Sequence, residues 1–315
     1  QPEGLPMNTD PPIVSVIIIS YNVSKLLEAC LDSLYSHAGK FPFEVLVVDN
    51  ASTDDSRQMV NQKFPQVRLF ASQKNLGFAG GNNLAIPRAR GRYLLLLNPD
   101  TVVLPDALDE LVYFLDAQPQ AGAAGSKLLN PDGSLQESCF PFPGLLRESW
   151  RMLHLDALYP LARYPMEDWS PALPHSVDVI QGASLMLRKT ALDQTGILDE
   201  TFFMYSEEVD LCYRLKKNGW SLHYIPSSAV IHYGGQSTRQ TAERMFLQLY
   251  QSKILFFRKH YGPVTAGLYK LMLYFSAALR VLLSPLAYLI SRSQRDKFRS
   301  TAALYAHLMK ALPQY

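Results

Sequence analysis

Three carboxylates lie within four residues of one another, at Glu207, Glu208 and Asp210. The segment 207–218 predicts a helix that ends at Gly219, and a first helical turn favours acidic side chains because of the helix dipole. The crowding also suits a general base, because neighbouring carboxylates raise one another's pKa and so improve one of them as a proton acceptor. Two interpretations of this cluster therefore stand side by side, a helix start and a catalytic base.

Polar residues follow three apolar segments that predict buried strands, at residues 13–19, 44–48 and 93–97. These polar groups are Ser20-Tyr21-Asn22, Asp49-Asn50 and Asn98-Pro99-Asp100. Asp49 could accept a hydrogen bond from the N3–H of uracil or thymine or from a ribose hydroxyl, and Asp100 could hold a divalent cation that binds two phosphates. Turns and helix caps use the same residue types, so neither carboxylate identifies a site alone.

The segment 75–83 holds three glycines and three asparagines in nine residues. Such a composition indicates a backbone that approaches a ligand closely, and we expect Gly77, Gly80 and Gly81 to lie in a loop before a short helix. The G-x-G-x-x-G spacing of a dinucleotide site is absent, and no Lys-Ser or Lys-Thr pair follows as in a P-loop. His232 precedes two further glycines, and both a structural role and a metal-ligand role are open to it.

Strands and helices alternate along the first hundred residues, with a further apolar run at 67–70. This alternation predicts an α/β fold with a doubly wound, parallel sheet and helices on both faces. Ligands bind such sheets beyond the carboxyl ends of the strands, where the three polar groups fall. The second half predicts a long ordered loop or lid over 130–174, a strand over 177–187 interrupted by Gly182, short strands at 222–225 and 229–231, and an amphipathic helix over 242–260.

Composition excludes several classes of protein. The chain has 315 residues, of which 48% are hydrophobic and 18% charged, so it is too apolar for a disordered chain and long enough for a full core. The net charge of +2 gives no general field for polyanions, and we expect no nucleic-acid partner. Three scattered cysteines are too few for a disulfide framework and favour a reducing compartment.

Both ends of the sequence differ from its body. Residues 1–12 contain neither the basic nor the apolar region of a signal peptide, and we expect them to be disordered or left over from cloning. From Tyr261 onward there are seven basic residues and one acidic residue, so this tail carries +6 whereas the first 260 residues carry −4. Its longest charge-free apolar stretches, of nine and ten residues, are too short to span a bilayer. A helical pair on an anionic membrane surface and a helical appendage packed on the body both fit.

Seven motifs together resemble the inverting family 2 glycosyltransferases, and above all their rhamnosyltransferase-like branch in bacterial cell-surface polysaccharide assembly. In chain order they are VSVIIISYN, VLVVDNASTDDS, NLGFAGGNN, LLLLNPDT, GASLMLRKTAL, GILDETFFMYSEEVDLCYRLKKNGW and HYGGQS. The resemblance covers about residues 13–262 and implies a GT-A fold, a Rossmann-like, mostly parallel sheet with helices on both faces. It implies a nucleotide-binding part at about 13–125, an acceptor-binding part at about 126–262 and a helical, basic and apolar tail at 263–315.

The resemblance also implies roles for individual residues. Those that would line the nucleotide and the donor sugar are Ser20, Tyr21, Asn22, Asp49, Asn75, Gly77, Asn98, Asp100, Gly182 and Ala183. Asp100 stands at the metal-binding end of the family's D-x-D motif, whose first position is Asn98 here, so the metal would rest on Asp100 with His232 as a second candidate. The catalytic base falls on Glu208, where the family usually has Asp, and Glu207 and Asp210 are rival candidates.

The implied activity is transfer of a sugar from a nucleotide diphosphate donor to an acceptor hydroxyl with inversion, aided by Mg²⁺ or Mn²⁺. The branch suggests dTDP-rhamnose, with a UDP-sugar as the other option, and a glycan or lipid-linked glycan acceptor. It also suggests a cytoplasmic enzyme in peripheral contact with the inner face of the bacterial membrane. The Q-x-x-R-W motif of processive members is absent, which favours single additions.

Two alternatives to a glycosyltransferase stay open. A sugar nucleotidyltransferase also uses a parallel sheet, a metal-binding carboxylate and a nucleotide. It usually carries a glycine-rich loop with a basic residue after its first strand, where this sequence has Ser20-Tyr21-Asn22. A non-catalytic, nucleotide-sugar-binding membrane scaffold is the second alternative, and it rests on Asn98 and on the unusual Glu207-Glu208 pair.

Overall fold

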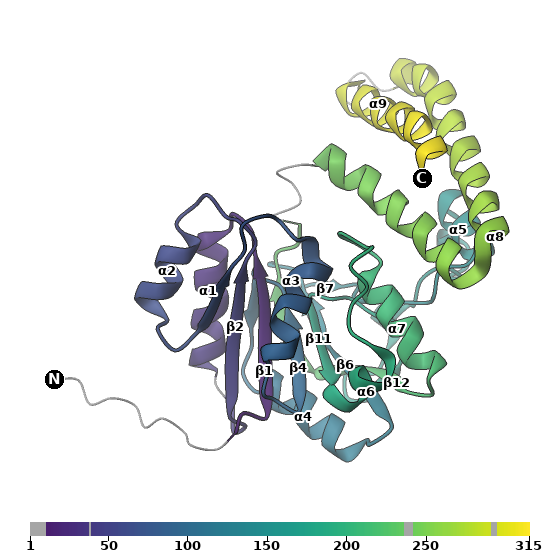
Figure 1. Cartoon of the computed structure of the whole chain (residues 1–315). Coiled ribbons are helices and arrows are strands. Elements are labelled where there is room, and N and C mark those ends of the chain that lie inside the picture. The colour runs from purple at the N-terminus through teal and green to yellow at the C-terminus, as the bar shows by residue number, and fades with distance from the viewer. Residues whose placement is uncertain (1–10, 38, 236–241, 291–294) are drawn as a thin grey trace.

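The computed structural model describes residues 11–37, 39–235, 242–290 and 295–315. The expectation for residues 1–12 therefore falls almost wholly outside the described residues. The described chain forms an α/β body with helices on both faces of one large sheet, and two C-terminal helices extend away from that body (Figure 1).

The large sheet has the strand order β3-β2-β1-β4-β11-β6-β12-β5. Its first half is parallel and consists of β1 (Val14–Ser20), β2 (Phe43–Asp49), β3 (Arg68–Ala71) and β4 (Tyr93–Leu97). Ser20 is in register with Asp49, and Ile18 with Leu97. The four predicted strands are thus confirmed within one residue, and the carboxyl ends of β1, β2 and β4 meet at one edge of the sheet.

The second half of the sheet is mixed. β11 (Ser184–Arg188) runs antiparallel between β4 and β6 (Ala121–Leu129), and β12 (Ser221–His232) runs parallel to β6. β5 (Thr101–Val103) lies antiparallel to β12, and the short strands β7 (Leu135–Gln136) and β9 (His175–Ser176) pair with β6 and β12. A separate antiparallel pair consists of β8 (Cys139–Phe140) and β10 (Val179–Ile180). The predicted parallel arrangement therefore holds for β1 to β4 and for β6 with β12, whereas β11 reverses direction between them.

Each face of the sheet carries its own hydrophobic core, because successive residues of a strand point to opposite faces. On one face, Val16 and Ile18 pack with α1 (Ser24–Ser36), α2 (Ser56–Lys63) and α4 (Ala107–Ala117). On the other face, Ile17 and Leu96 pack with α3 (Gly77–Ala85), α6 (Lys189–Thr195) and α7 (Glu207–Lys217). This two-sided burial explains why these strands are uninterrupted apolar runs in the sequence.

The glycine-rich segment is helical, so the prediction of a loop over its glycines is wrong. α3 begins at Gly77 and includes Gly80 and Gly81. A Cβ on Gly81 would lie 2.8 Å from the side chain of Ile19 in β1, and a Cβ on Gly77 would lie 2.0 Å from the carbonyl oxygen of Phe203. The segment needs glycine because the helix packs closely on its neighbours, and at Gly77 also because φ is +73°.

Two other boundaries differ from the predictions. The Pro-rich residues 130–174 contain the helix α5 (Leu145–Met152) as well as β7 and β8. The two short strands predicted near residues 222–231 are one strand, β12, with an irregularity between Ile225 and Ala229. The interruption predicted at Gly182 is confirmed, because it divides the strand predicted over 177–187 into β10 and β11. Short 3₁₀ turns lie at Ile86–Arg88, Leu155–Ala157, Met166–Asp168 and Leu312–Gln314.

The C-terminal part has a core of its own. α8 (Ala242–Ile290) is broken at Gly262, where φ is +88°, and α9 (Arg295–Ala311) packs back against α8. Buried side chains of both helices, among them Phe257, Tyr269 and Leu308, form this core together with parts of α5. In Figure 1 the two helices stand apart from the sheet, with α5 beside α8. The predicted boundaries between the nucleotide-binding part, the acceptor-binding part and the tail lie inside secondary-structure elements: residue 125 is in β6 and residue 262 is in α8. The division of the chain at these residues therefore remains a prediction.

One helical stretch in the described part of the chain, Ala242–Leu283, is long and apolar enough to cross a membrane by length and composition alone. Only 22% of its most apolar window is buried inside the protein. The sequence analysis missed this stretch because it counted only residues between charged side chains, and Lys270 and Arg280 divide the stretch into short segments.

Candidate active site

A cleft of about 280 Å³ opens at the carboxyl ends of β1, β2 and β4. The start of α3, the turn before β11, the start of α7 and the end of β12 complete its wall. The predicted residues that line this cleft are Tyr21, Asn75, Gly77, Asn98, Asp100, Gly182, Ala183, Glu207, Glu208 and His232. Segments more than 200 residues apart in the sequence therefore meet at the edge of the sheet that the strand pattern indicated.

Three residues predicted for the nucleotide do not line the cleft. Ser20 is fully buried at the end of β1. Asn22 Oδ1 accepts a hydrogen bond from the backbone N–H of Thr53, at 2.8 Å. Asp49 is buried and pairs with Arg57, whose Nε lies 2.7 Å from Asp49 Oδ2, while Asp49 Oδ1 has no hydrogen-bond partner among the described residues.

Asn50 joins two of these segments and was not among the predicted site residues. Its Nδ2 donates to the carbonyl oxygen of Gly77 at 2.9 Å and to Asn75 Oδ1 at 3.2 Å, and its Oδ1 accepts from the backbone N–H of Leu76 at 3.0 Å. The side chain at the end of β2 thus holds the start of α3 at the cleft. Its position directly after Asp49 is the signal that could have identified it.

Gly182 and Ala183 form a narrow part of the wall. A Cβ on Gly182 would lie 3.1 Å from Phe78 Cζ and 3.9 Å from Glu208 Cβ, so no larger residue fits there without displacing Phe78. The carbonyl oxygen of Ala183 accepts from the backbone N–H of Asn98, at 3.0 Å. The turn between β10 and β11 is therefore attached to the end of β4 and lies against the carboxylate pair.

Asp100, His232 and Asn98 lie together on this wall. His232 Nε2 is 3.4 Å from Asp100 Oδ1 and 3.2 Å from Asn98 Nδ2. The pairing of β5 with β12 holds them there, because Thr101 is in register with His232 and the backbone N–H of Tyr233 donates to the Asp100 carbonyl at 3.0 Å. The sequence could not show this pairing, since β5 and β12 are 130 residues apart.

This pair suits a divalent cation that also binds a diphosphate. One carboxylate oxygen and one imidazole nitrogen within 3.4 Å of each other are two ligands of the kinds that Mg²⁺ and Mn²⁺ accept. No group of three His, Cys, Asp or Glu side chains that could hold a metal is present in the described chain. The remaining ligands would come from phosphate oxygens and water, as is usual for Mg²⁺ in phosphate-transfer sites.

The carboxylate pair at the start of α7 lies in a poorly solvated place. Burial raises the pKa of Glu208, and hydrogen bonds from the backbone amides of Glu208 and Val209 offset only part of that rise. The pKa of Glu207 is raised well above its ordinary value, because the negative charge of Glu208 adds to the effect of burial. One oxygen of each carboxylate, Oε2, has no hydrogen-bond partner among the residues that the structure describes. Glu207 is buried whereas the Glu208 side chain is partly exposed, so we expect the pair to ionise at Glu208 first.

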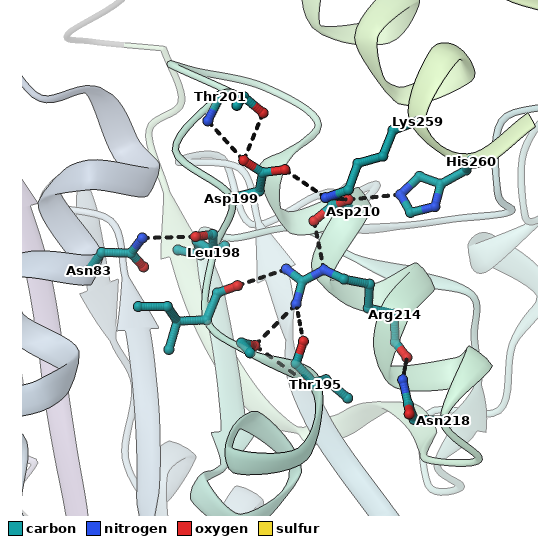
Figure 2. A network of polar contacts seen from close by, with 12 residues as sticks. Asn83, Thr195, Leu198, Asp199, Thr201, Asp210, Arg214, Asn218, Lys259 and His260 are labelled. Atoms are coloured by element: carbon teal, nitrogen blue, oxygen red, sulfur yellow. Dashed lines mark hydrogen bonds and ion pairs between the residues drawn. The ribbon is translucent and has the colours of Figure 1, made fainter. Parts of the chain in front are cut away.

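The structure separates Asp210 from this pair. Asp210 lies outside the cleft wall, fully buried, and its carboxylate contacts Arg214 Nε at 2.8 Å, Lys259 Nζ at 2.6 Å and His260 Nε2 at 2.7 Å (Figure 2). Burial alone would raise the pKa of Asp210, but the bonds from His260 and Lys259 and the charge of Arg214 outweigh it and hold the pKa at about 2. These contacts attach α7 to α8.

Backbone strain occurs at four non-glycine residues next to the cleft. Asn22, Ala51, Tyr205 and Ser206 have φ angles from 53° to 67°. Such conformations cost about 1–3 kcal/mol each and are found where the surrounding structure imposes them, often at functional sites. Tyr205 and Ser206 directly precede Glu207, so the strained turn sets the direction in which the first residues of α7 face.

The open side of the cleft is lined by apolar side chains and by the guanidinium of Arg244. Phe203, Met204 and Tyr205 line this side, directly before the acidic cluster in the sequence. Met245 and Arg244 come from the first turn of α8, and the Arg244 guanidinium lies over the Phe203 ring at 5.7 Å. Neither α8 residue was predicted, because nothing near residue 244 in the sequence indicates contact with a strand end.

Comparison with known proteins decides the family. A profile described as glycosyl transferase family 2 matches residues 15–138, and one described as glycosyl transferase family group 2 matches residues 93–312. The N-acetylglucosaminyl-diphospho-decaprenol L-rhamnosyltransferase of Mycobacterium tuberculosis is 33% identical over 241 residues, which cover 72% of this chain and 78% of that protein. The chain belongs to glycosyltransferase family 2.

Further relatives place this glycosyltransferase in the rhamnosyltransferase branch. The rhamnosyltransferase WbbL of Escherichia coli K12 is 25% identical over 243 residues, which cover 74% of this chain and 88% of that protein. The mannosyltransferase PcManGT of Pyrobaculum calidifontis, solved with GDP-Man and Mn²⁺, superposes with a TM-score of 0.57 at 20% identity over 96% of this chain and 86% of that one. The last comparison concerns the fold, which is the GT-A fold of glycosyltransferases, as predicted.

Proposed function

We propose that this glycosyltransferase transfers rhamnose from dTDP-rhamnose to a lipid-linked glycan, with inversion at the anomeric carbon. The observation that carries the proposal is that the Glu207-Glu208 pair and the Asp100–His232 pair share one cleft at the carboxyl edge of the sheet. One pair can take a proton and the other can bind a metal-held diphosphate, which are the two tasks of a displacement at a nucleotide-linked sugar.

The donor would lie along the wall from β1 to β12. Tyr21 and Asn75 would contact the nucleoside, and Asp100 and His232 would hold Mg²⁺ or Mn²⁺, which supports the negative charge of the departing diphosphate. Mn²⁺ and a nucleotide-sugar occupy the solved mannosyltransferase of the same fold, which supports a divalent cation here. Asp49 Oδ1 has no hydrogen-bond partner among the described residues but is buried, so it would accept from the nucleoside only after neighbouring side chains uncover it.

The proton of the acceptor hydroxyl would pass to Glu208. Glu208 lies beside Gly182 at the floor of the sugar site, and its raised pKa improves it as an acceptor while it still ionises before Glu207. The hydroxyl oxygen then attacks the anomeric carbon as the bond from that carbon to the diphosphate oxygen breaks on the opposite face. Asp210 cannot serve, because its oxygens already contact the side chains of Arg214, Lys259 and His260.

The relatives support the proposed acceptor class, and product analysis tests it. The Mycobacterium tuberculosis relative is named for an N-acetylglucosaminyl-diphospho-decaprenol acceptor. With a shorter-chain analogue of that lipid, dTDP-rhamnose and Mn²⁺, we expect a rhamnosylated lipid and free dTDP, and no turnover of UDP-glucose. Mass spectrometry of the lipid and chromatography of the nucleotide measure both products. Release of pyrophosphate from a sugar phosphate and dTTP would instead indicate a nucleotidyltransferase, and donor binding with neither hydrolysis nor transfer would indicate a scaffold.

A lipid acceptor requires access to a membrane, and we propose that α8 provides it from the cytoplasmic side. Large apolar side chains with three- and four-residue spacing lie exposed after the kink at Gly262, namely Val264, Leu268, Leu271, Phe275, Leu279 and Leu282. This spacing puts them on one face of the helix, and an apolar face beside basic residues suits the surface of an anionic bilayer.

Charged substitutions on this face should release the protein from membranes. We expect Leu268→Glu combined with Phe275→Glu to weaken binding to vesicles of phosphatidylglycerol and phosphatidylcholine at least tenfold, because both side chains would leave the apolar layer. Co-sedimentation at several lipid concentrations measures the effect. Tyr113→Glu, at a position on α4 of the body that is about as exposed as Leu268, is the control and should bind like the wild type. Equal binding of the double variant would contradict the proposed contact.

A further inference from the structure

The side of His232 that faces away from Asp100 contacts Gln136. His232 Nδ1 lies 2.6 Å from Gln136 Oε1, while His232 Nε2 faces Asn98 Nδ2 and Asp100 Oδ1. An amide oxygen can only accept a hydrogen bond, so the ring proton of a neutral His232 belongs on Nδ1. Nε2 is then the unprotonated nitrogen, and it is the one that faces the cleft.

The orientation of the Gln136 amide is itself determined by its neighbours. Gln136 Nε2 donates to Asn130 Oδ1 at 2.8 Å and to the backbone oxygen of His232 at 3.2 Å. Rotating the amide by half a turn would place its oxygen against these two oxygens, which cannot donate a hydrogen bond. The amide oxygen Oε1 is therefore the atom that faces the imidazole. Asn130 is held in turn, because its Nδ2 donates to Ser134 Oγ at 3.0 Å.

The sheet brings Gln136 and His232 together from opposite edges of one strand. Leu128 of β6 is in register with Gln136 of β7 on one side and with Val230 of β12 on the other. The turn from β6 to β7 is closed by the backbone N–H of Asn130, which donates to the Ser134 oxygen at 2.8 Å. The segment 130–136 is thus a built hairpin whose last residue reaches across the end of β6 to the imidazole.

We propose that Gln136 is a positioning residue of the metal site and holds His232 in the Nδ1–H tautomer, so that Nε2 is available as a ligand. The inference rests on the proposed function for the role of the metal, whereas the tautomer follows from the hydrogen bonds alone. Outer partners of this kind commonly change metal affinity by about 10–100-fold when they are removed. Gln136 is 96 residues from His232 in the sequence and belongs to none of the motifs of the family resemblance.

The test compares two substitutions of similar size. Gln136→Met cannot accept the ring proton, and we expect His232 to move toward the Nε2–H tautomer and the affinity for Mn²⁺ in the presence of dTDP to fall about 10–100-fold. Gln136→Glu can still accept from Nδ1 and should keep the wild-type tautomer. The ring nitrogens are observed by ¹⁵N–¹H correlation spectra of the metal-free protein at alkaline pH, with His232→Gln to assign the signals, and Mn²⁺ binding is measured by electron paramagnetic resonance.

Two results would overturn the inference: an unchanged Nδ1–H tautomer in Gln136→Met, or Mn²⁺ affinity equal to the wild type in that variant. Failure of the proposed function looks different. In that case the wild type itself would bind no Mn²⁺ with dTDP, while the ring spectra, which are recorded without metal, would still differ between the wild type and Gln136→Met. Circular dichroism and thermal unfolding of both variants confirm that the hairpin and the sheet have folded.

Discussion

Replacing Glu208 with glutamine should lower kcat by about 10²–10⁴-fold and leave the affinity for the nucleotide-sugar donor within about twofold. The amide keeps the size of the side chain beside Gly182 but cannot take the proton of the acceptor hydroxyl. Calorimetric titration of dTDP-rhamnose measures donor affinity, and the rate of rhamnosylated lipid formation measures kcat. A Glu208→Gln enzyme with wild-type kcat would contradict the assignment of the base.

The neighbouring residue supplies the matched control. Glu207 keeps its proton to higher pH than Glu208, because it is buried and experiences the charge of Glu208. A glutamine at position 207 therefore resembles the protonated side chain that is already present, and we expect Glu207→Gln to lose less than about tenfold in kcat. The reverse pattern, with Glu207→Gln inactive and Glu208→Gln active, would transfer the role of base to Glu207.

The pH profile separates the two carboxylates further. A base acts in its ionised form, and a raised pKa means that Glu208 holds its proton to higher pH than the ordinary value of 4.5. Wild-type kcat/KM should therefore fall as the pH decreases through that raised pKa. This acidic limb should persist in Glu207→Gln and disappear from the residual activity of Glu208→Gln.

Replacing Asp100 with asparagine should remove the effect of metal on nucleotide binding. Wild-type protein should bind dTDP about 100-fold or more tightly with Mn²⁺ than without it, because a cation held by Asp100 and His232 would offset the negative charge of the diphosphate. Asp100→Asn keeps the shape of the side chain and loses the charge. Calorimetric titrations of dTDP and UDP, each with and without Mn²⁺, measure the effect and also show which base the cleft prefers.

The control for this experiment lies within the same titrations. Without metal, Asp100→Asn and the wild type should bind dTDP equally, because Tyr21 and Asn75 on the nucleoside wall are unchanged. Loss of metal-free binding in the variant would mean that the substitution has damaged the cleft. An equal enhancement by Mn²⁺ in both proteins would place the metal elsewhere.

The site residues that directly follow strands of the parallel sheet could be predicted from the sequence. Buried parallel strands are continuous apolar runs, and their carboxyl ends meet at one edge, so the positions of Tyr21, Asn98 and Asp100 follow from strand order. Helical geometry could also have separated the acidic residues, because positions two apart on a helix differ by about 200° in direction. Glu208 and Asp210 accordingly face the cleft and the interior on opposite sides of α7.

The parts that were missed depend on pairing between distant segments. β6 is rich in alanine and glycine, with no β-branched residue, so its sequence gives little strand signal, and only its burial between β11 and β12 makes it a strand. The glycines of α3 were assigned to a loop because local composition cannot show that a helix must lie directly on Ile19. Arg244 and Gln136 reach the site through α8 and through a hairpin, which no local pattern relates to it.

The cluster around Asp210 bears on how such enzymes could exchange parts during evolution. Lys259 and His260 belong to α8, yet Lys259 supplies a countercharge and His260 a hydrogen bond to a fully buried carboxylate on the helix that begins with Glu207 and Glu208. The chain after Gly262 supplies none of these contacts, although its side chains complete the core that Phe257 shares with Tyr269 and Leu308. An exchange point one helical turn before Gly262 would remove the contacts to Asp210, and stripping the partners from a buried charge costs about 3–5 kcal/mol. The turn of α8 just before the kink at Gly262 is therefore the part of the C-terminal helices that any exchange would have to keep.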